Sequence, residues 1–322
     1  MENIQQLTDN DNGIVNRLIG HNNVIPNTAY EIMRHPLEKD IKKNQAFTQI
    51  YRNADATTIE HLIFTSNKNM TIEEFINCMN NASLRVWSDM QNEQNSIMKI
   101  DFSFLMKLNL INQYNMDTFT VKIPADITFG EIYLISLDYV GLYIRINNID
   151  VQLFESIDVV CNYRYIDNPL RKRLEKEYHS NSIQIINKCS EVNITNNNCY
   201  KLDIKDQSGI TKGYFMEGDL CNLDSFCIRV NGYDRFASYD QVMIDLYCKI
   251  TENLYYFSYT NKHNYEDLST NSYVGSPNTQ NINELVMLLK FNGTQKNSTL
   301  KIYSVSKGLI HYQNGFTKIT NI

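Results

Sequence analysis

The chain has 322 residues, and its 43% hydrophobic and 11% aromatic content is enough to build one large or two medium cores. That content excludes a wholly disordered chain, and the 12 glycines and 5 prolines exclude collagen-like and proline-rich sequences. The net charge of −6 and the pI near 5.6 argue against a protein that coats nucleic acid, because that function needs a strongly basic surface.

Residues 1–20 lack the basic and apolar regions of a secretory signal. No run reaches the roughly 18 apolar residues that are needed to cross a bilayer. The seven cysteines are scattered and odd in number, and none forms a CxxC pair. We therefore expect reduced, structural thiols in a cytosolic compartment.

The first part of the chain gives mixed signals. Residues 1–45 are polar and are interrupted at His35-Pro36, so we expect an N-terminal arm with one short helix. Residues 58–64 partly alternate and predict a strand. Residues 71–79 predict a short helix capped by Thr71, with Glu74 at the third position after it. The apolar runs at 84–87 and 97–108 do not indicate whether they form strands or helices.

From residue 117 onward, the sequence pattern is that of a β protein. Strands are predicted at 117–123, 132–146, 156–166, 182–186, 200–204, 226–230, 241–250, 254–259, 284–291 and 300–305. Gly141 inside the second of these predicts a bulge or a bend. The Asn-Gly pairs that begin at Asn231, Asn292 and Asn314 predict tight turns.

One helix stands out among these strands, at residues 169–180, with Pro169 at its first position and a body rich in Leu, Arg, Lys and Glu. The Asn-rich stretch 261–283 predicts a long surface loop. Many short strands with few helices indicate an all-β protein made of sandwiches or barrels.

No recognised catalytic or cofactor motif is present. There is no Gly-rich phosphate loop, no HExxH and no GxSxG. The six histidines are dispersed: His21, His35, His61, His179, His263 and His311. Asp234 beside Arg235 and Asp167 near Arg171 are interpreted as structural ion pairs. We therefore expect no catalytic residue, no cofactor site, no metal site and no enzymatic activity.

Three groups of segments, in the same order, resemble the double jelly-roll major capsid proteins of nucleocytoplasmic large DNA viruses. They are Ile123–Ile146 (IPADITFGEIYLISLDYVGLYIRI), Val159–Gln184 (VVCNYRYIDNPLRKRLEKEYHSNSIQ), and the set Cys227–Phe236, Tyr255–Thr260 and Leu300–Phe316. In that family the first segment closes one jelly roll and the second opens the next. The chain is a short and divergent likeness, with the polar stretch 271–283 in place of a characteristic family element. Its ending, GLIHYQNGFTKITNI, also resembles a relative, the poxvirus scaffold protein.

The resemblance implies an all-β fold of two consecutive antiparallel jelly-roll β-sandwiches with few short helices. We expect an N-terminal arm at 1–45, a reduced first jelly roll at 46–152 and a second jelly roll at 153–322. The boundary is expected between Asn147 and Ile157, with the strand at 156–166 opening the second jelly roll.

The resemblance also implies a viral structural protein. Three chains would form a homotrimer, a pseudo-hexagonal capsomer that tiles an icosahedral shell beside neighbouring capsomers and minor capsid proteins. The implied location is the virion capsid, after assembly in the host cytoplasm. The chain would make no direct nucleic-acid contact, would have no transmembrane segment and would meet an inner membrane only through other proteins.

Other classes stay open at this point. A scaffold or minor capsid paralogue would share the same fold. A carbohydrate-binding β-sandwich would need a concave aromatic face, and Trp87 is the only tryptophan. A cupin-type enzyme would need clustered histidines, which the spacing does not offer. A trimer in solution would favour a capsid or scaffold protein. A monomer that binds glycans would favour the carbohydrate-binding β-sandwich.

Overall fold

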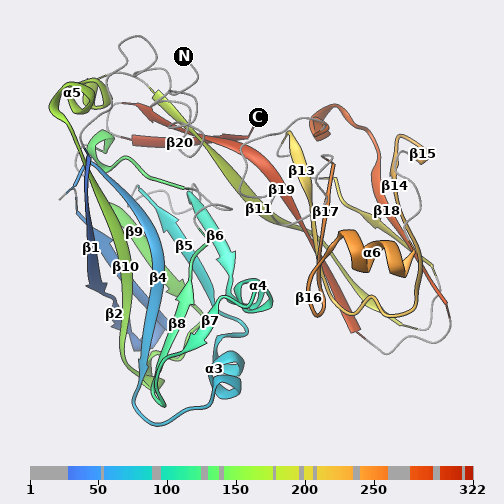
Figure 1. The fold of residues 1–322 in the computed structure, drawn as a ribbon, viewed down its shortest axis with the longest axis horizontal. Coiled ribbons are helices and arrows are strands. Elements are labelled where there is room, and N and C mark those ends of the chain that lie inside the picture. Colours follow the sequence, from blue (N-terminus) through green and yellow to red (C-terminus); the bar gives the residue numbers. More distant parts are fainter. Residues whose placement is uncertain are drawn as a thin grey trace. The chain divides into compact units, whose positions relative to one another are not determined.

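A computed structural model describes most of the chain, and its elements are labelled in Figure 1. The described residues are 28–51, 54–88, 96–124, 130–137, 141–176, 179–195, 199–205, 209–234, 240–259, 276–292, 298–313 and 316–321. These residues form mainly β-strands with four short α-helices, and every strand pair with a described register is antiparallel. The expected all-β class is confirmed.

The chain divides into two compact units. The first contains Met1–Ile183 together with Leu309–Thr320, and the second contains Gln184–Gly308 with Asn321–Ile322. The first unit is therefore built from two separate stretches of the sequence, and the second unit lies between them in chain order.

The first unit holds two five-stranded sheets (Figure 1). One has the order β1 (Thr28–Pro36), β10 (Phe154–Ile166), β4 (Ala56–Ser66), β8 (Thr118–Lys122) and β7 (Ile111–Gln113). The other has the order β2 (Glu38–Asp40), β3 (Gln45–Ile50), β9 (Leu142–Asn147), β5 (Ser83–Trp87) and β6 (Met98–Asp101). In β9 buried and half-buried residues alternate strictly, as expected for a strand with one face toward a core.

Five phenylalanines form the centre of the first core: Phe64, Phe75, Phe102, Phe119 and Phe154, all fully buried. They come from β4, β8 and β10 and from two helices, α3 (Ile72–Met79) and α4 (Phe102–Lys107). The ring of Phe75 stacks on Phe119 with centroids 4.4 Å apart, and it meets the edge of Phe64 at 5.3 Å. Helix α3 thus supplies a ring to the core of the sheets.

The predicted helix at 71–79 is confirmed as α3, and so is its cap. The Thr71 hydroxyl accepts a hydrogen bond from the Glu74 amide at 3.2 Å, and the Glu74 carboxylate accepts one from the Thr71 amide at 2.8 Å. This reciprocal pair is a capping box, which satisfies two amides that the helix itself leaves without partners.

The second unit also holds two sheets. One has the order β11 (His179–Ile194), β19 (Ser298–Gln313), β13 (Thr211–Glu217), β17 (Leu254–Ser258) and β16 (Lys249–Thr251). Strand β20 (Phe316–Asn321), whose residues up to Thr320 belong to the first unit, pairs with β19. The other has the order β12 (Cys199–Asp203), β18 (Leu285–Phe291), β14 (Leu223–Val230) and β15 (Tyr233–Asp234). Helix α6 (Gln241–Tyr247) contacts β14 and β16.

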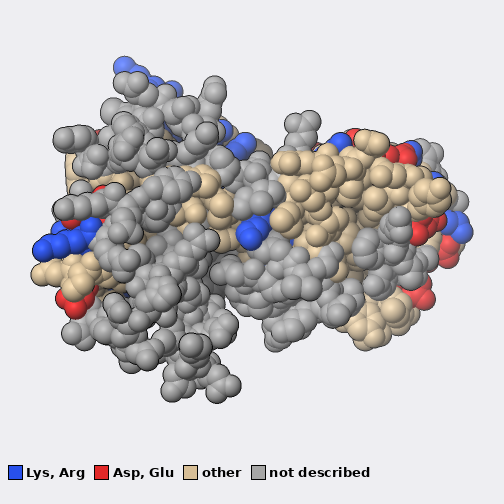
Figure 2. Space-filling model, turned by 90° about the horizontal axis from the view of Figure 1, so that it is seen from above, with Lys and Arg blue, Asp and Glu red and all other residues tan. Residues whose placement is uncertain are grey.

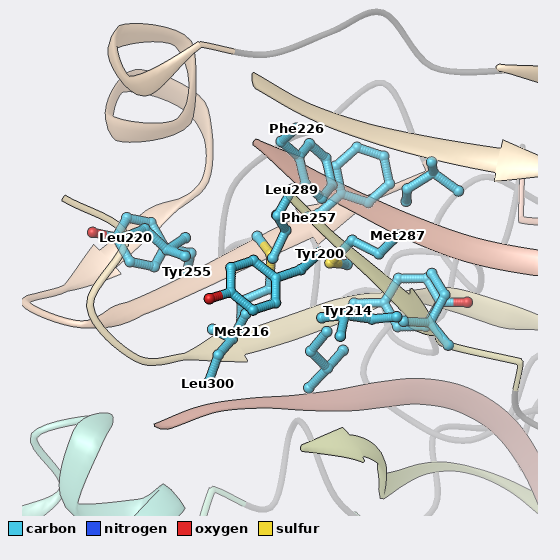
Figure 3. Close-up of a cluster of buried hydrophobic side chains, with 14 of the residues drawn as sticks. Tyr200, Tyr214, Met216, Leu220, Phe226, Tyr255, Phe257, Met287, Leu289 and Leu300 are labelled. Carbon is cyan, nitrogen blue, oxygen red and sulfur yellow. The ribbon is translucent and has the colours of Figure 1, made fainter. Parts of the chain in front are cut away.

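The core of the second unit lies between its two sheets (Figure 3). Tyr214 and Met216 of β13 and Phe257 of β17 come from one sheet, and Phe226 of β14 and Leu289 of β18 come from the other. The rings of Phe226 and Phe257 lie 5.3 Å apart between centroids. Each unit is therefore a sandwich of two antiparallel sheets.

The turn predicted at Asn231-Gly232 is confirmed between β14 and β15. Both residues have positive φ, 49° and 83°, which is the conformation that a two-residue hairpin of this type requires. The turns expected at Asn292-Gly293 and Asn314-Gly315 lie wholly or partly outside the described residues, as does most of the loop expected at 261–283.

Two predicted strands are wrong. The run 132–146 is not one strand, because residues 134–136 form a 3₁₀ turn and only β9 continues as a strand. Gly141 stands just before β9, where a Cβ would lie 1.9 Å from the Ile50 carbonyl oxygen. The run 241–250 begins with helix α6 instead of a strand, because the Asp240 carboxylate accepts a hydrogen bond from the Met243 amide at 2.9 Å and starts a helix.

The structure also corrects the expected division at 152/153. Strand β10 does not open the second sandwich, since it pairs with β1 and β4 inside the first unit. The compact units separate at 183/184 instead. Part of the expected arm is sheet as well, because residues 28–36 form β1 and pair with β10 along their whole length.

The predicted helix at 169–180 is present as α5 (Asn168–Lys176), which connects β10 to β11. Leu174 is buried, and the Ser136 hydroxyl donates to its carbonyl oxygen at 3.2 Å. The helix belongs to the first unit and not, as expected, to the second.

The end of the chain returns to the first unit. Tyr312, at the end of β19, is almost fully buried, and its hydroxyl oxygen accepts a hydrogen bond from the Tyr133 amide at 3.2 Å. The two rings meet edge to face at 6.0 Å. Burial raises the pKa of the Tyr312 hydroxyl far above its ordinary range, so this group stays neutral and packs as part of the core.

Candidate interaction surfaces

The described histidines do not gather. His35 on β1 makes a 2.7 Å hydrogen bond with the hydroxyl of Tyr163, His61 lies on β4, and His311 lies near the end of β19. Among the described residues, no group of three His, Cys, Asp or Glu side chains is placed to hold a metal ion. The expectation that the protein has no catalytic or metal site stays a prediction.

All seven cysteines are free thiols, as the sequence predicts. Burial raises the pKa of Cys161 and of Cys248 to about 12, which keeps both thiols protonated and unreactive. Cys199 and Cys221 are exposed. For Cys221 a hydrogen bond with Asp219 raises the thiol pKa, followed by partial burial, which disfavours the reactive thiolate.

The two predicted ion pairs form with other partners. The guanidinium of Arg171 lies 3.2 Å from Asp55, and the buried Asp55 also accepts a hydrogen bond from the Ile166 amide at 2.6 Å. Asp234 pairs with Arg229 at 2.7 Å, across the β14–β15 hairpin. Both carboxylates fix the ends of strands or helices, which is a structural role.

Trp87 does not present a ring face for a sugar. Its side chain is buried, Tyr143 stacks on it with centroids 5.5 Å apart, and the guanidinium of Arg145 lies 4.8 Å from the ring centroid. The aromatic platform that a carbohydrate-binding module needs is therefore not formed by this residue.

Most of the exposed large apolar side chains fall in two stretches of the sequence. Twelve large hydrophobic residues are exposed among the described residues, and ten of them fall in two stretches. One stretch, on the first unit, contains Tyr30, Ile32, Ile41, Phe47 and Tyr51. The other, on the second unit, contains Tyr233, Val242, Met243, Leu246 and Tyr247.

Both stretches carry charges of both signs, and each contains a lysine–aspartate pair, Lys43–Asp40 at 3.8 Å and Lys249–Asp245 at 4.0 Å. Residues 38–43, which include Ile41, contain three lysines and two carboxylates, and the side chain of Lys43 is 71% exposed. Residues 240–252 contain three carboxylates, Asp240, Asp245 and Glu252, and one lysine. Figure 2 shows one face of the molecule, on which the described surface of the second unit is largely uncharged and its charged side chains lie toward the margin.

No helix among the described residues is long and apolar enough to span a bilayer. The described helices have nine residues or fewer.

No protein-family model and no curated protein matches the chain by sequence. Solved structures do match it. A chain of the PBCV-1 virus capsid aligns with a TM-score of 0.68 and 14% identity, covering 92% of this chain and 97% of that one. The Faustovirus major capsid protein aligns with a TM-score of 0.62 and 6% identity, covering 91% of each chain. The major capsid protein P2 of bacteriophage PM2 aligns with a TM-score of 0.51 and 8% identity, covering 89% of this chain and all of P2.

The fold is that of the double jelly-roll viral capsid proteins, as the sequence resemblance predicts. The alignment extends over nearly the whole length of both chains, so it includes both sandwiches and not one of them alone.

Proposed function

We propose that this chain is a structural protein of a viral capsid, without enzymatic activity. The observation that carries the proposal is the match to a PBCV-1 capsid chain over 92% of this chain and 97% of that one. The chain consists of two consecutive sandwiches, each with a packed core that contains aromatic side chains. Such blocks suit a role in building a shell better than a role in binding a small molecule in a pocket.

The working unit is a homotrimer. Three chains with two sandwiches each place six similar blocks around one axis, and such a pseudo-hexagonal capsomer tiles an icosahedral shell. Its partners are copies of itself, neighbouring capsomers and minor capsid proteins, and it binds no nucleic acid directly. Its location is the virion capsid, after assembly in the host cytoplasm, and any inner membrane is met through other proteins.

The test is the mass of the purified full chain by sedimentation velocity at micromolar concentration, followed by electron microscopy of the same sample. The expected result is one species near three times 37.6 kDa, with particles of threefold outline. A single monomeric species that does not change with concentration would contradict the trimer. Binding of that monomer to a glycan array would favour the carbohydrate-binding module instead.

A further inference from the structure

The strands β1, β10, β4, β8 and β7 lie side by side in one sheet of the first unit (Figure 1). Successive side chains of a strand point to opposite faces of its sheet. One face of this sheet carries Phe64 and Phe119, which the register places opposite each other in the core. We call the other face, which points away from the core, the outer β10 face.

An apolar stripe runs diagonally across the outer β10 face. Tyr30 and Ile32 of the edge strand β1 are 64% and 67% exposed. Val160 of β10 is the diagonal neighbour of Ile32, and Ile63 of β4 is the diagonal neighbour of Val160. Val160 and Ile63 are half-buried. The registers of a single sheet thus place these four apolar side chains along one line.

The charged groups on and beside this face balance one another. They are three cations and three anions: Arg34, Lys122, Arg164, Asp158, Glu60 and Glu131. Arg34 lies 2.6 Å from Asp158, and Arg164 lies 2.6 Å from Glu131. The Glu60 carboxylate accepts a hydrogen bond from Asn162 at 3.0 Å.

Glu31, the other carboxylate of β1, belongs to the opposite face of that strand, where the Tyr165 hydroxyl donates to it at 2.6 Å. With His61 neutral, the outer β10 face therefore has no net formal charge. The buried centres of protein interfaces are distinguished by such a depletion of unbalanced charge. A neutral face can also meet a copy of itself without repulsion.

The face is just large enough for a specific contact. Strands β1, β10 and β4 have 9, 13 and 11 residues. At about 3.3 Å per residue and about 4.8 Å per strand, these three strands cover roughly 500 Å². Two such faces together contribute roughly 1,000 Å², which is about the area at which specific protein contacts begin. We therefore expect a weak contact that joins subunits already assembled.

We propose that the outer β10 face of one copy packs on the outer β10 face of a second copy, sheet against sheet. The inference rests on the proposed capsid function and adds a contact between trimers. A contact between identical surfaces has twofold symmetry, so it cannot relate the three subunits around a threefold axis and must join one trimer to the next. Tyr30, Ile32, Val160 and Ile63 of both copies would form its centre.

The first experiment places charge on the stripe of the full chain. The acidic variant carries Tyr30→Glu and Ile32→Glu, and the basic variant carries Tyr30→Lys and Ile32→Lys. Both positions are exposed, so folding should be retained, and circular dichroism checks this. Each variant would meet its own charge across the contact, so we expect trimers of either one to associate at least about tenfold more weakly than parent trimers in sedimentation velocity.

The matched controls carry the same charges outside the stripe. Tyr114 and Met116 are 79% and 71% exposed in the turn between β7 and β8. Chains with Tyr114→Glu and Met116→Glu, or with lysine at both positions, should assemble like the parent. Controls that lose assembly as strongly as the stripe variants would assign the effect to net charge and overturn the inference.

An equimolar mixture of the acidic and basic variants identifies the geometry. Opposite charges then face each other across a contact of identical surfaces, so association between trimers should return to the level of the parent. If the outer β10 face met a different surface of its neighbour, that surface would be unchanged in both variants. Mixing would then restore nothing, and the inference would be overturned.

The same sedimentation measurements separate this inference from the proposed function. A parent that forms trimers and nothing larger at every concentration would overturn the twofold contact and leave the capsid trimer standing. A parent that forms dimers which both charge variants disrupt, and never a trimer, would support the contact and contradict the trimer. A parent that stays monomeric would overturn both.

Discussion

The stacked Phe75 offers a sharp test of how the first unit is held together. Its ring is fully buried, and it contacts three other rings of the core, at 4.4 Å to Phe119, 5.3 Å to Phe64 and 6.1 Å to Phe154 between centroids. Truncation of a buried phenylalanine to alanine costs about 3–5 kcal/mol, a range that already includes its lost ring contacts. Because Phe75 contacts three other rings, we expect Phe75→Ala to lie in the upper part of this range and to lower the free energy of unfolding by about 4–5 kcal/mol.

Urea unfolding followed by tryptophan fluorescence measures this directly. Trp87 is the only tryptophan of the chain and lies buried in the first unit, so its signal reports on the unit that contains Phe75. Phe75→Leu keeps an apolar side chain in the core but loses the ring contacts, so it should cost clearly less than Phe75→Ala and more than an exposed substitution. Met116→Ala, at an exposed position, should stay within about 0.5 kcal/mol of the parent. A Phe75→Ala chain within about 1 kcal/mol of the parent would refute the packing described for α3.

Three further predictions follow from single positions. Leu174→Asp should destabilise the fold by roughly 2 kcal/mol or more in thermal or urea unfolding, because it places a carboxylate at a buried contact of α5. Gly141→Val should cost at least about 1–3 kcal/mol in the same assay, since its Cβ would meet the Ile50 carbonyl oxygen at 1.9 Å. Burial lowers the pKa of His35 below its ordinary 6.5, so the unfolded chain binds that proton more tightly, and stability should fall as the pH drops through about 6.5. His35→Gln should weaken this pH dependence.

Each of these has a clear opposite result. Equal melting temperatures for Leu174→Asp and the parent would mean that α5 does not pack on the first unit. A fully stable Gly141→Val chain would show that the backbone at β3 and β9 is not as close as described. An unchanged pH profile in His35→Gln would assign the acid sensitivity to other groups.

Local chemistry explains which elements were predictable. The capping box at Thr71 and Glu74 and the Asn231-Gly232 turn depend on side chains a few residues apart, so the sequence contains the whole signal. Helix α6 was missed because its body, QVMIDLY, is rich in residues that also favour strands, while the deciding feature is the single capping residue Asp240.

The division of the chain was less predictable because strand pairing is non-local. The sequence correctly predicts a strand at β10, but the strands that pair with it, β1 and β4, lie about a hundred residues away in the sequence. Nothing in the residues of β10 distinguishes a strand that closes one sandwich from a strand that opens another. The exposed apolar side chains were missed for the same reason, since the exposure of Leu246 or Ile32 is set by which side of each element the tertiary structure covers.

The return of Leu309–Thr320 to the first unit means that the core of the first unit is completed late in synthesis. Every residue of the second unit up to Gly308 leaves the ribosome before Tyr312 does, so the unit nearest the N-terminus is the last to receive all of its core. Until then the Tyr133 amide lacks the tyrosine hydroxyl that accepts its hydrogen bond. A chain that ends before Leu309 therefore cannot complete the core of its first unit.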